Sequence, residues 1–352
     1  MNIKITGSGS YIPNKVVKNS DFIDHEFLNE DGTNFPYDGA QVIEKFRNIT
    51  GIEERRYADD SLVASDLAYF AAERAIADAG IDPETLDYII FAHNFGDVRK
   101  NEIQSDILPS LASRVKNKLR IKNPKCVAYD ILFGCPGWIE GMIQAMSFIK
   151  AGMAKKCLVI GGETLSRVVD PHDRDGMIYS DGAGATVVEQ TDQEGGILAI
   201  NSATFTYDEV DYLFFGCSNN TKHDPSVRYI KMYGRKIYEF ALSNVSNAMK
   251  ECLDKSGIDI HDVKKILIHQ ANEKMDEAII QRFYKLYNQK PPAGIMPMSI
   301  HYLGNSSVAT VPTLYDLLLN GKIKDQSINK GDVVIFASVG AGMNINAIVY
   351  KI

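Results

Sequence analysis

Three residues, far apart in the sequence, have the types and local settings needed for acyl-transfer chemistry. Cys135 stands between an apolar run and a helix-forming segment, His269 lies in the string IHQAN, and Asn305 lies in GNSS. A thiol at a helix N-terminus feels the positive end of the helix dipole, which lowers its pKa and favours the nucleophilic thiolate. Such residues can converge in a fold as a nucleophile and its polar partners. We therefore predict a Cys–His–Asn site for acyl chemistry.

Each of these residues also has a plainer interpretation. Free cysteines are commonly buried filler, a histidine at a strand end often satisfies a backbone carbonyl, and Asn305 could simply cap a helix. The setting of the cysteine favours chemistry, because Gly134 and Pro136 describe a sharp strand-to-helix turn. Such a turn exposes the thiol and leaves backbone N–H groups that suit an oxyanion.

Composition limits the function classes. The chain has 352 residues, 45% of them hydrophobic and 24% charged, which is typical of a soluble globular protein larger than one average domain. A net charge of −7 without a run of Lys or Arg argues against a nucleic-acid partner. No apolar segment approaches the about 20 residues of a membrane helix, and the N-terminus does not resemble a signal peptide. We expect a cytoplasmic protein with no membrane contact.

The cysteines also favour an intracellular location. There are five, scattered along the chain with no CxxC pair, which argues against a disulfide framework or a zinc site and for a reducing compartment. Nothing in the sequence suggests a metal or an organic redox cofactor, so we expect none.

The sequence contains an internal repeat. Residues 71–94 and 248–272 share the order helix, Gly stop, acidic turn and buried strand, and residues 181–188 are echoed by 340–349. The acidic stretch 189–196 is the natural boundary between the copies. We expect two similar halves, residues 1–192 with the cysteine and residues 193–352 with the histidine and asparagine.

Short β-branched apolar runs alternate with helical patterns along the chain, which is typical of an α/β protein. The apolar runs cover residues 88–91, 127–132, 157–160, 183–188, 197–200, 266–268, 333–337 and 346–350. The helical patterns cover residues 61–79, 103–118, 136–150, 234–255, 272–287 and 306–319. The apolar runs often do not alternate with polar residues, so we expect strands that are covered on both faces.

A second histidine, His93, also follows a strand. In the internal repeat it lies one place beyond Ala92, the residue that matches His269. We therefore expect His93 to have a structural or peripheral role.

The strings around these residues resemble those of the β-ketoacyl-acyl-carrier-protein synthase III family of thiolase-fold condensing enzymes. Cys135, His269, Asn305 and the turn at 181–185 carry the resemblance. The resemblance extends over nearly the whole chain, and residues 50–56 and 165–174 also match the family. The resemblance implies an α/β fold of the five-layered αβαβα type, made of two similar halves and usually found as a homodimer. A plain thiolase is a poorer match, because thiolases carry a second cysteine where this chain has Ser338 and Val339.

The resemblance implies a decarboxylating Claisen condensation. Cys135 would take an acyl group from a coenzyme A or carrier-protein thioester. His269 and Asn305 would bind the carbonyl of malonyl-acyl-carrier protein and stabilise the enolate that forms as CO2 leaves. Two neutral donors aimed at a developing oxyanion suit this step, each worth about 10²–10³ in rate. The product would be a β-ketoacyl chain, in the initiation of fatty-acid synthesis.

Two alternatives stay open on the sequence alone. A family member in a specialised pathway could use the same three residues with a longer acyl donor. A thioester hydrolase or an acyl-binding protein could be built on the same fold.

Substrate-binding residues are placed by the same resemblance. The family's glycine-rich turn commonly has three glycines, and here it reads Gly340, Ala341, Gly342, with Ala341 expected to donate an oxyanion N–H. Arg174 matches an arginine that stacks on the adenine of coenzyme A, but the aromatic residue expected opposite it is Lys45. The loss of a stacking platform weakens base binding by about 1–3 kcal/mol by analogy with stacked nucleobases.

At the acyl end, we place Leu108 and Trp138 at the pocket. Leu108 replaces a bulkier aromatic residue that gates the pocket from the neighbouring subunit. The smaller gate favours an acyl group larger than acetyl, delivered by carrier protein rather than coenzyme A.

A carrier protein is strongly acidic, so this acidic chain needs a local basic patch. The segment after IHQAN offers Lys274 and Arg282, and the segment before it offers Lys231 and Arg235. Lys274 matches a docking arginine of the family. A solvated charged face explains the same residues equally well.

Overall fold

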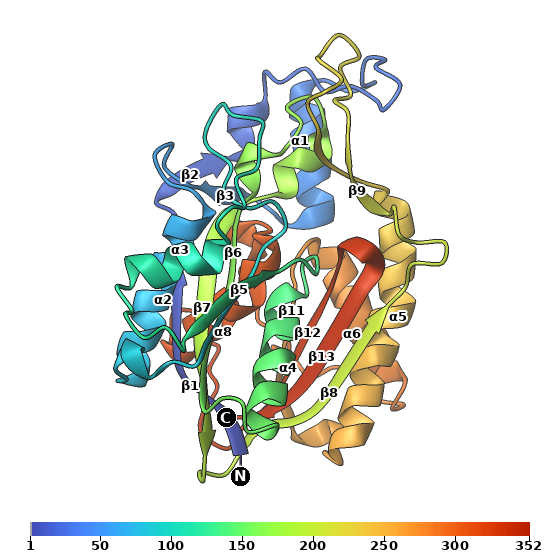
Figure 1. Ribbon diagram of the computed structural model, residues 1–352. Helices are drawn as coiled ribbons and strands as arrows, with labels where there is room; N and C mark the ends of the chain where they lie inside the picture. The colour runs from blue at the N-terminus through green and yellow to red at the C-terminus, as the bar shows by residue number, and fades with distance from the viewer. Residues whose placement is uncertain (1) are drawn as a thin grey trace.

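The structure, a computed structural model, describes residues 2–352. Two β-sheets stand side by side with helices between them and helices on both outer faces (Figure 1). The five layers alternate helix, sheet, helix, sheet, helix, which confirms the predicted fold class. The two ends of the chain lie close together at one end of the layers.

The sheet of the N-terminal half has the order β1-β7-β6-β4-β5. β4 runs parallel to β5 and β6, whereas β7 is antiparallel to both β6 and β1. Its strands are β1 (Asn2–Tyr11), β4 (Tyr88–Ala92), β5 (Val127–Ile131), β6 (Lys156–Thr164) and β7 (Asp181–Thr191).

The sheet of the C-terminal half has the order β11-β12-β13-β8. The sequence of one parallel and two antiparallel pairings is the same as in β4-β6-β7-β1, so the internal repeat is a repeat of topology. Its strands are β8 (Gly196–Thr204), β11 (Val263–Ile268), β12 (Val333–Gly340) and β13 (Asn344–Lys351). The chain passes from the first sheet to the second between Thr191 and Gly196.

The helices fill the three remaining layers. α4 (Gly137–Lys150) and α8 (Thr310–Leu319) lie between the sheets and contact both of them. α2 (Ala64–Ala79) and α3 (Leu111–Lys118) cover the outer face of the first sheet. α5 (Gly234–Ser256) and α6 (Glu273–Lys285) cover the second. The α4 and α8 side chains interlock with both sheets in one buried apolar cluster, which joins the two halves.

The remaining elements gather at the opposite end from the termini (Figure 1). They are β2 (Lys15–Lys18), β3 (Glu54–Tyr57), α1 (Gly39–Thr50), β9 (Leu213–Gly216), β10 (Tyr229–Met232) and the short α7 (Ile300–Leu303). A separate apolar cluster that includes Phe46 and Ile52 lies among these elements.

Two expectations about elements are wrong in detail. The helix predicted over 103–118 begins only at Leu111, because the Ser110 hydroxyl accepts a hydrogen bond from the Ser113 N–H and caps the helix there. The preceding loop is closed on itself by a bridge between Asp97 and Asp106. β5 is not covered on both faces: it forms the edge of its sheet and is partly exposed along its length.

Candidate active site

The turn that carries Cys135 joins β5 to α4. Gly134 takes a left-handed conformation with φ of 65°. A Cβ at this position would lie 2.6 Å from the backbone nitrogen of Ala341, so glycine is required both for the turn and for the close approach of the second chain segment. The cysteine is therefore clamped between the start of α4 and the glycine-rich turn.

His269 directly follows β11 in the second sheet. Its backbone N–H donates to the carbonyl of Ala337 at 2.9 Å, which continues the pairing with β12 by one residue. The Asn272 side chain accepts from the Met275 N–H at 3.1 Å and caps α6. The strand end and the helix cap together fix the corner from which the imidazole projects.

Asn305 is held by its backbone and by its side-chain oxygen. Its N–H donates to the Ile178 carbonyl at 2.9 Å, and its own carbonyl accepts from the Ser180 N–H at 2.8 Å. The side-chain Oδ1 accepts from the Ser307 N–H at 2.8 Å. Because Oδ1 is occupied in this way, the amide Nδ2 is left as the donor.

Cys135, His269 and Asn305 line one cavity of about 380 Å³. The wall is mostly apolar and comes from both halves of the chain. It includes Phe95, Leu132, Leu213, Phe214, Ile230 and Met275. An apolar chamber with a thiol and two polar side chains suits a thioester with a hydrocarbon chain.

The glycine-rich turn Gly340, Ala341, Gly342 lines the same cavity. A Cβ on Gly340 would lie 2.3 Å from the Cys135 nitrogen, so this residue must be glycine. The Asn344 side chain stabilises the turn, since its Nδ2 donates to the Ala341 carbonyl at 2.8 Å. The Ala341 backbone is thus placed beside the turn that carries the cysteine.

Comparison with known proteins identifies the family. The chain is 31% identical over 353 residues to beta-ketoacyl-[acyl-carrier-protein] synthase III 1 of Bacillus cereus, with 100% of this chain and 99% of that protein covered. The chain belongs to the synthase III family. The family models for 3-oxoacyl-[acyl-carrier-protein] synthase III and for its C-terminal part match residues 129–205 and 253–352.

Two further synthase III proteins agree. The enzyme of Staphylococcus aureus strain JH1 is 30% identical over 356 residues, covering 100% of this chain and 99% of its own length. The crystal structure of 3-oxoacyl-[acyl-carrier-protein] synthase III from Aquifex aeolicus superposes with a TM-score of 0.80 at 30% identity and covers 99% of this chain and 100% of its own.

The electrostatics of Cys135 differ from the expectation. Burial raises the pKa of the Cys135 thiol to about 11, and the hydrogen bond from Ser307 only partly offsets this. The residue is partly exposed where it lines the cavity, while protein atoms surround the sulfur. The prediction of a lowered pKa is wrong in sign, because desolvation of the thiolate is the largest influence on this pKa.

His269 is neutral at physiological pH. Burial lowers its pKa to about 4, against a smaller rise from the Ser307 backbone. Within residues 2–352 its Nδ1 has no hydrogen-bond partner. A neutral imidazole carries a single N–H, so His269 can offer one donor to a substrate oxygen and has no charge of its own.

These shifts predict how the reactivity of Cys135 depends on pH. Because the thiol pKa is about 11, the thiolate fraction rises about tenfold per pH unit at lower pH. We expect iodoacetamide labelling of the Cys135 peptide, followed by mass spectrometry, to accelerate from pH 7 to pH 9 without a plateau. A plateau below pH 8 would show instead that the helix end dominates.

Two residues predicted at the acyl pocket do not line the cavity of their own chain. Trp138 is 1% exposed and lies between the sheets, where its ring meets Phe336 edge to face and its Nε1 donates to Thr186. It is a core residue, so its assignment to the pocket is wrong. Leu108 is 87% exposed on the loop before α3 and is not among the residues that line the cavity.

Arg174 has an aromatic partner that the sequence comparison missed. Its guanidinium lies over the ring of Phe35, 4.7 Å from the centroid, and the two residues line a neighbouring hollow together with Phe214. Phe214 also lines the catalytic cavity, so the hollow adjoins it. Lys45, at the expected aromatic position, instead covers Tyr37 with its ammonium group 3.0 Å from the ring centroid.

Of the four basic residues predicted at the docking surface, three are exposed and Lys231 is not. Lys274 and Arg282 are exposed on α6, and Arg235 is exposed on α5, where it pairs with Glu239 at 2.9 Å. Lys231 is buried and bonded to the carboxylates of Asp170 and Asp173, so it cannot serve as a docking residue.

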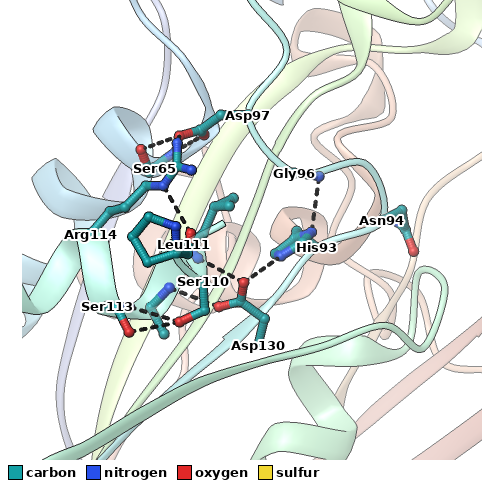
Figure 2. A network of polar contacts seen from close by, with 12 residues as sticks. Ser65, His93, Asn94, Gly96, Asp97, Ser110, Leu111, Ser113, Arg114 and Asp130 are labelled. Atoms are coloured by element: carbon teal, nitrogen blue, oxygen red, sulfur yellow. Dashed lines mark hydrogen bonds and ion pairs between the residues drawn. The ribbon is translucent and has the colours of Figure 1, made fainter. Parts of the chain in front are cut away.

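His93 takes part in a separate network and does not line the cavity. Its Nδ1 accepts from the Gly96 N–H at 3.1 Å, so Nε2 carries the proton and donates to Asp130 at 3.0 Å. Asp130 also accepts from the N–H groups of Leu111 and Ala112 at the start of α3 (Figure 2). This arrangement fits the structural role expected for His93.

Within residues 2–352, no group of three or more His, Cys, Asp or Glu side chains is arranged to hold a metal ion. Of the helices in the same residues, none combines the length and apolar character that a membrane span requires.

Proposed function

We propose that this protein condenses an acyl thioester with malonyl-acyl-carrier protein, with loss of CO2, to start a fatty-acid chain. One observation carries the proposal: a thiol, a neutral imidazole and an amide from both halves of the chain line a single apolar cavity. The curated synthase III relatives carry this activity in their names and match the chain from end to end.

The first half-reaction is acyl transfer to sulfur. The thiolate of Cys135 attacks the thioester carbonyl, and the oxyanion of the tetrahedral intermediate accepts hydrogen bonds from the backbone N–H groups of Cys135 and Ala341. The carbon–sulfur bond to the carrier then breaks. The departing thiolate takes up the proton that Cys135 has lost.

The second half-reaction forms the carbon–carbon bond. The carboxylate of the malonyl unit leaves as CO2, and its bonding electrons pass into an enolate whose oxygen is held by His269 and the Nδ2 of Asn305. The carbanion attacks the acyl-Cys135 carbonyl, and the thiolate of Cys135 is released. Since decarboxylation supplies the carbanion, no base strong enough for a C–H bond is needed, and we retain the prediction that no metal or organic cofactor takes part.

A panel of acyl thioesters tests the proposal. Purified protein is incubated with malonyl-acyl-carrier protein and one acyl-coenzyme A or acyl-carrier protein at a time, and the products are identified by mass. We expect a β-ketoacyl-carrier product with at least one donor. Release of the free fatty acid alone would instead indicate a hydrolase.

We infer that the carrier protein docks beside the first turns of α5 and α6. Both helices border the cavity, through Ile237 and Met275, and both expose basic side chains there, Arg235 and Lys274. An acidic carrier would meet these charges just where its thioester arm must enter.

Charge reversal tests the docking surface. In the Arg235→Glu, Lys274→Glu double variant, which reverses the two basic side chains at the first turns of α5 and α6, we expect the KM for malonyl-acyl-carrier protein to rise about tenfold or more. Acyl transfer from coenzyme A should be unchanged. The Lys122→Glu, Lys125→Glu double variant, at two exposed positions between α3 and β5, carries the same change in net charge and is the control. Equal KM values in the Arg235→Glu, Lys274→Glu variant and the wild type would rule out this surface.

We also infer a homodimer that acts in the cytoplasm. The edge strand β5 and the loop before α3 expose large apolar side chains, among them Leu108, Leu132 and Ile103, and a second copy would cover them. A reduced Cys135 thiol requires a reducing compartment. A solution mass of one chain by light scattering would contradict the dimer.

A further inference from the structure

We propose that Asn94 and Ser307, anchored by Glu163, form a positioning chain that delivers one hydrogen bond to the sulfur of Cys135. The inference rests on the proposed function, in which Cys135 is the acyl acceptor. It assigns a role to two further residues that line the cavity beside Cys135 and that act through the nucleophile.

The contacts are continuous from the first sheet to the sulfur. Glu163, near the end of β6, accepts from the Asn94 backbone N–H at 2.8 Å and from its Nδ2 at 2.6 Å. The same Nδ2 donates to the Ser307 Oγ at 3.1 Å. Ser307 Oγ in turn donates to the Cys135 Sγ at 3.3 Å.

The direction of these hydrogen bonds is fixed by counting protons. A side-chain amide nitrogen carries two N–H groups, and Asn94 uses one on Glu163 and one on Ser307. The Ser307 oxygen therefore receives a proton from Asn94 and turns its own proton toward sulfur. With this polarity, Ser307 stabilises the thiolate more than the thiol.

Ser307 is held in an unusual backbone conformation at this point. Its φ is 52°, in the left-handed region that residues other than glycine seldom occupy. The Oδ1 of Asn305 holds the Ser307 N–H at 2.8 Å. A conformation of this kind persists only where its surroundings maintain it, and such residues cluster at functional sites.

The anchor is suited to sit behind a nucleophile. Glu163 is buried, and burial raises its pKa to about 8, against the hydrogen bonds from Asn94. Near neutral pH the carboxyl is mostly protonated, so it accepts hydrogen bonds without placing a full negative charge behind the thiolate. Asn94 is free for this role because its neighbour His93 points the other way, toward Asp130 (Figure 2).

The hydrogen bonds from Glu163 through Asn94 and Ser307 to Cys135 should affect the rate of acyl transfer and not the rate of malonyl decarboxylation. Sulfur is the reacting atom in the first half-reaction, whereas the enolate oxygen is held by His269 and Asn305 in the second. A merely structural role would lower both steps together, so the two rates distinguish the roles.

The test compares iodoacetamide labelling of Cys135 at pH 7 in the wild type and in Ser307→Gly. Glycine adopts the left-handed backbone freely, so this variant removes the hydroxyl without adding strain. We expect the thiol pKa to rise by about one unit and the thiolate fraction to fall about tenfold. A more basic thiolate is about threefold more reactive, which leaves a net slowing of about threefold.

The neighbouring serine gives a matched control. Ser306 bonds to Thr310 at 3.3 Å, and Ser306→Ala should label at the wild-type rate. Asn94→Ala and Glu163→Leu should slow labelling in the same direction as Ser307→Gly. Glu163→Gln keeps an acceptor oxygen and should restore labelling to within about twofold of wild type, since hydrogen bonding to the neutral group is retained.

Two results would overturn the inference: wild-type labelling in Ser307→Gly, or equal slowing of acyl transfer and malonyl decarboxylation in that variant. Failure of the proposed function is a separate outcome. It would appear as wild-type protein that forms no acyl adduct at Cys135 with any thioester, whatever the labelling rates are.

Discussion

Replacing Cys135 with serine is expected to abolish the acyl adduct and to lower condensation by at least about 10³-fold. Loss of the nucleophile in covalent catalysts costs up to about 10⁶ in rate, because the remaining groups can only bind and polarise. A serine hydroxyl in the same place is far less acidic than the thiol, even though burial raises the pKa of Cys135 to about 11. Intact-protein mass after exposure to acyl-coenzyme A, together with steady-state product formation, measures both effects.

Cys217→Ser is the matched control for that experiment. Cys217 is an exposed free thiol that directly follows β9, and its sulfur accepts a hydrogen bond from Arg228 at 3.0 Å. It does not line the catalytic cavity. We expect this variant to acquire the adduct as the wild type does. An adduct that survives in Cys135→Ser would place the acyl group elsewhere.

Replacing Asn305 with aspartate is expected to slow malonyl decarboxylation by about 10²–10³-fold, the usual cost of losing one oxyanion donor. Aspartate keeps an oxygen to accept from the Ser307 N–H, a bond of 2.8 Å here, so the local fold is preserved. It loses the N–H donor and turns a negative charge toward the developing enolate. Release of CO2 from malonyl-acyl-carrier protein measures the effect.

The adduct separates this effect from a general loss of activity. Asn305→Asp should still form acyl-Cys135, and His269→Ala should behave in the same way, since both residues act on the second half-reaction. Asn329→Asp, at an exposed position between α8 and β12, controls for the same chemical change at a distance. If Asn305→Asp decarboxylated at the wild-type rate, the enolate would have to be stabilised by another group.

The sequence singled out Cys135, His269 and Asn305 because each lies at a corner just after a strand or helix ends. Cys135 follows β5, His269 follows β11, and Asn305 follows the Gly304 turn, and strings at such corners are short and specific. The repeat, read from residues 71–94 and 248–272, likewise predicted two sheets with one topology. Local patterns carry this information since they fix turns and caps directly.

Other features depended on packing that no local pattern encodes. Trp138 lies three residues after Cys135, yet α4 runs into the interior, and most of its residues near Cys135 are buried, so the apolar pattern alone does not distinguish pocket from core. Phe35 meets Arg174 from a loop that is far away in the sequence. The pKa of Cys135 depended on a balance between helix end and burial, and only the folded structure gives the burial.

The central claim is that Cys135 holds an acyl group that is passed to a malonyl carbon in the same cavity. A chase experiment tests it most directly: acyl-enzyme is formed with a labelled acyl-coenzyme A, freed of excess donor, and mixed with malonyl-acyl-carrier protein. We predict that the adduct disappears, that CO2 is released, and that the label appears in β-ketoacyl-carrier protein in equal amount. Label recovered as free fatty acid, or an adduct that persists unchanged, would contradict the account.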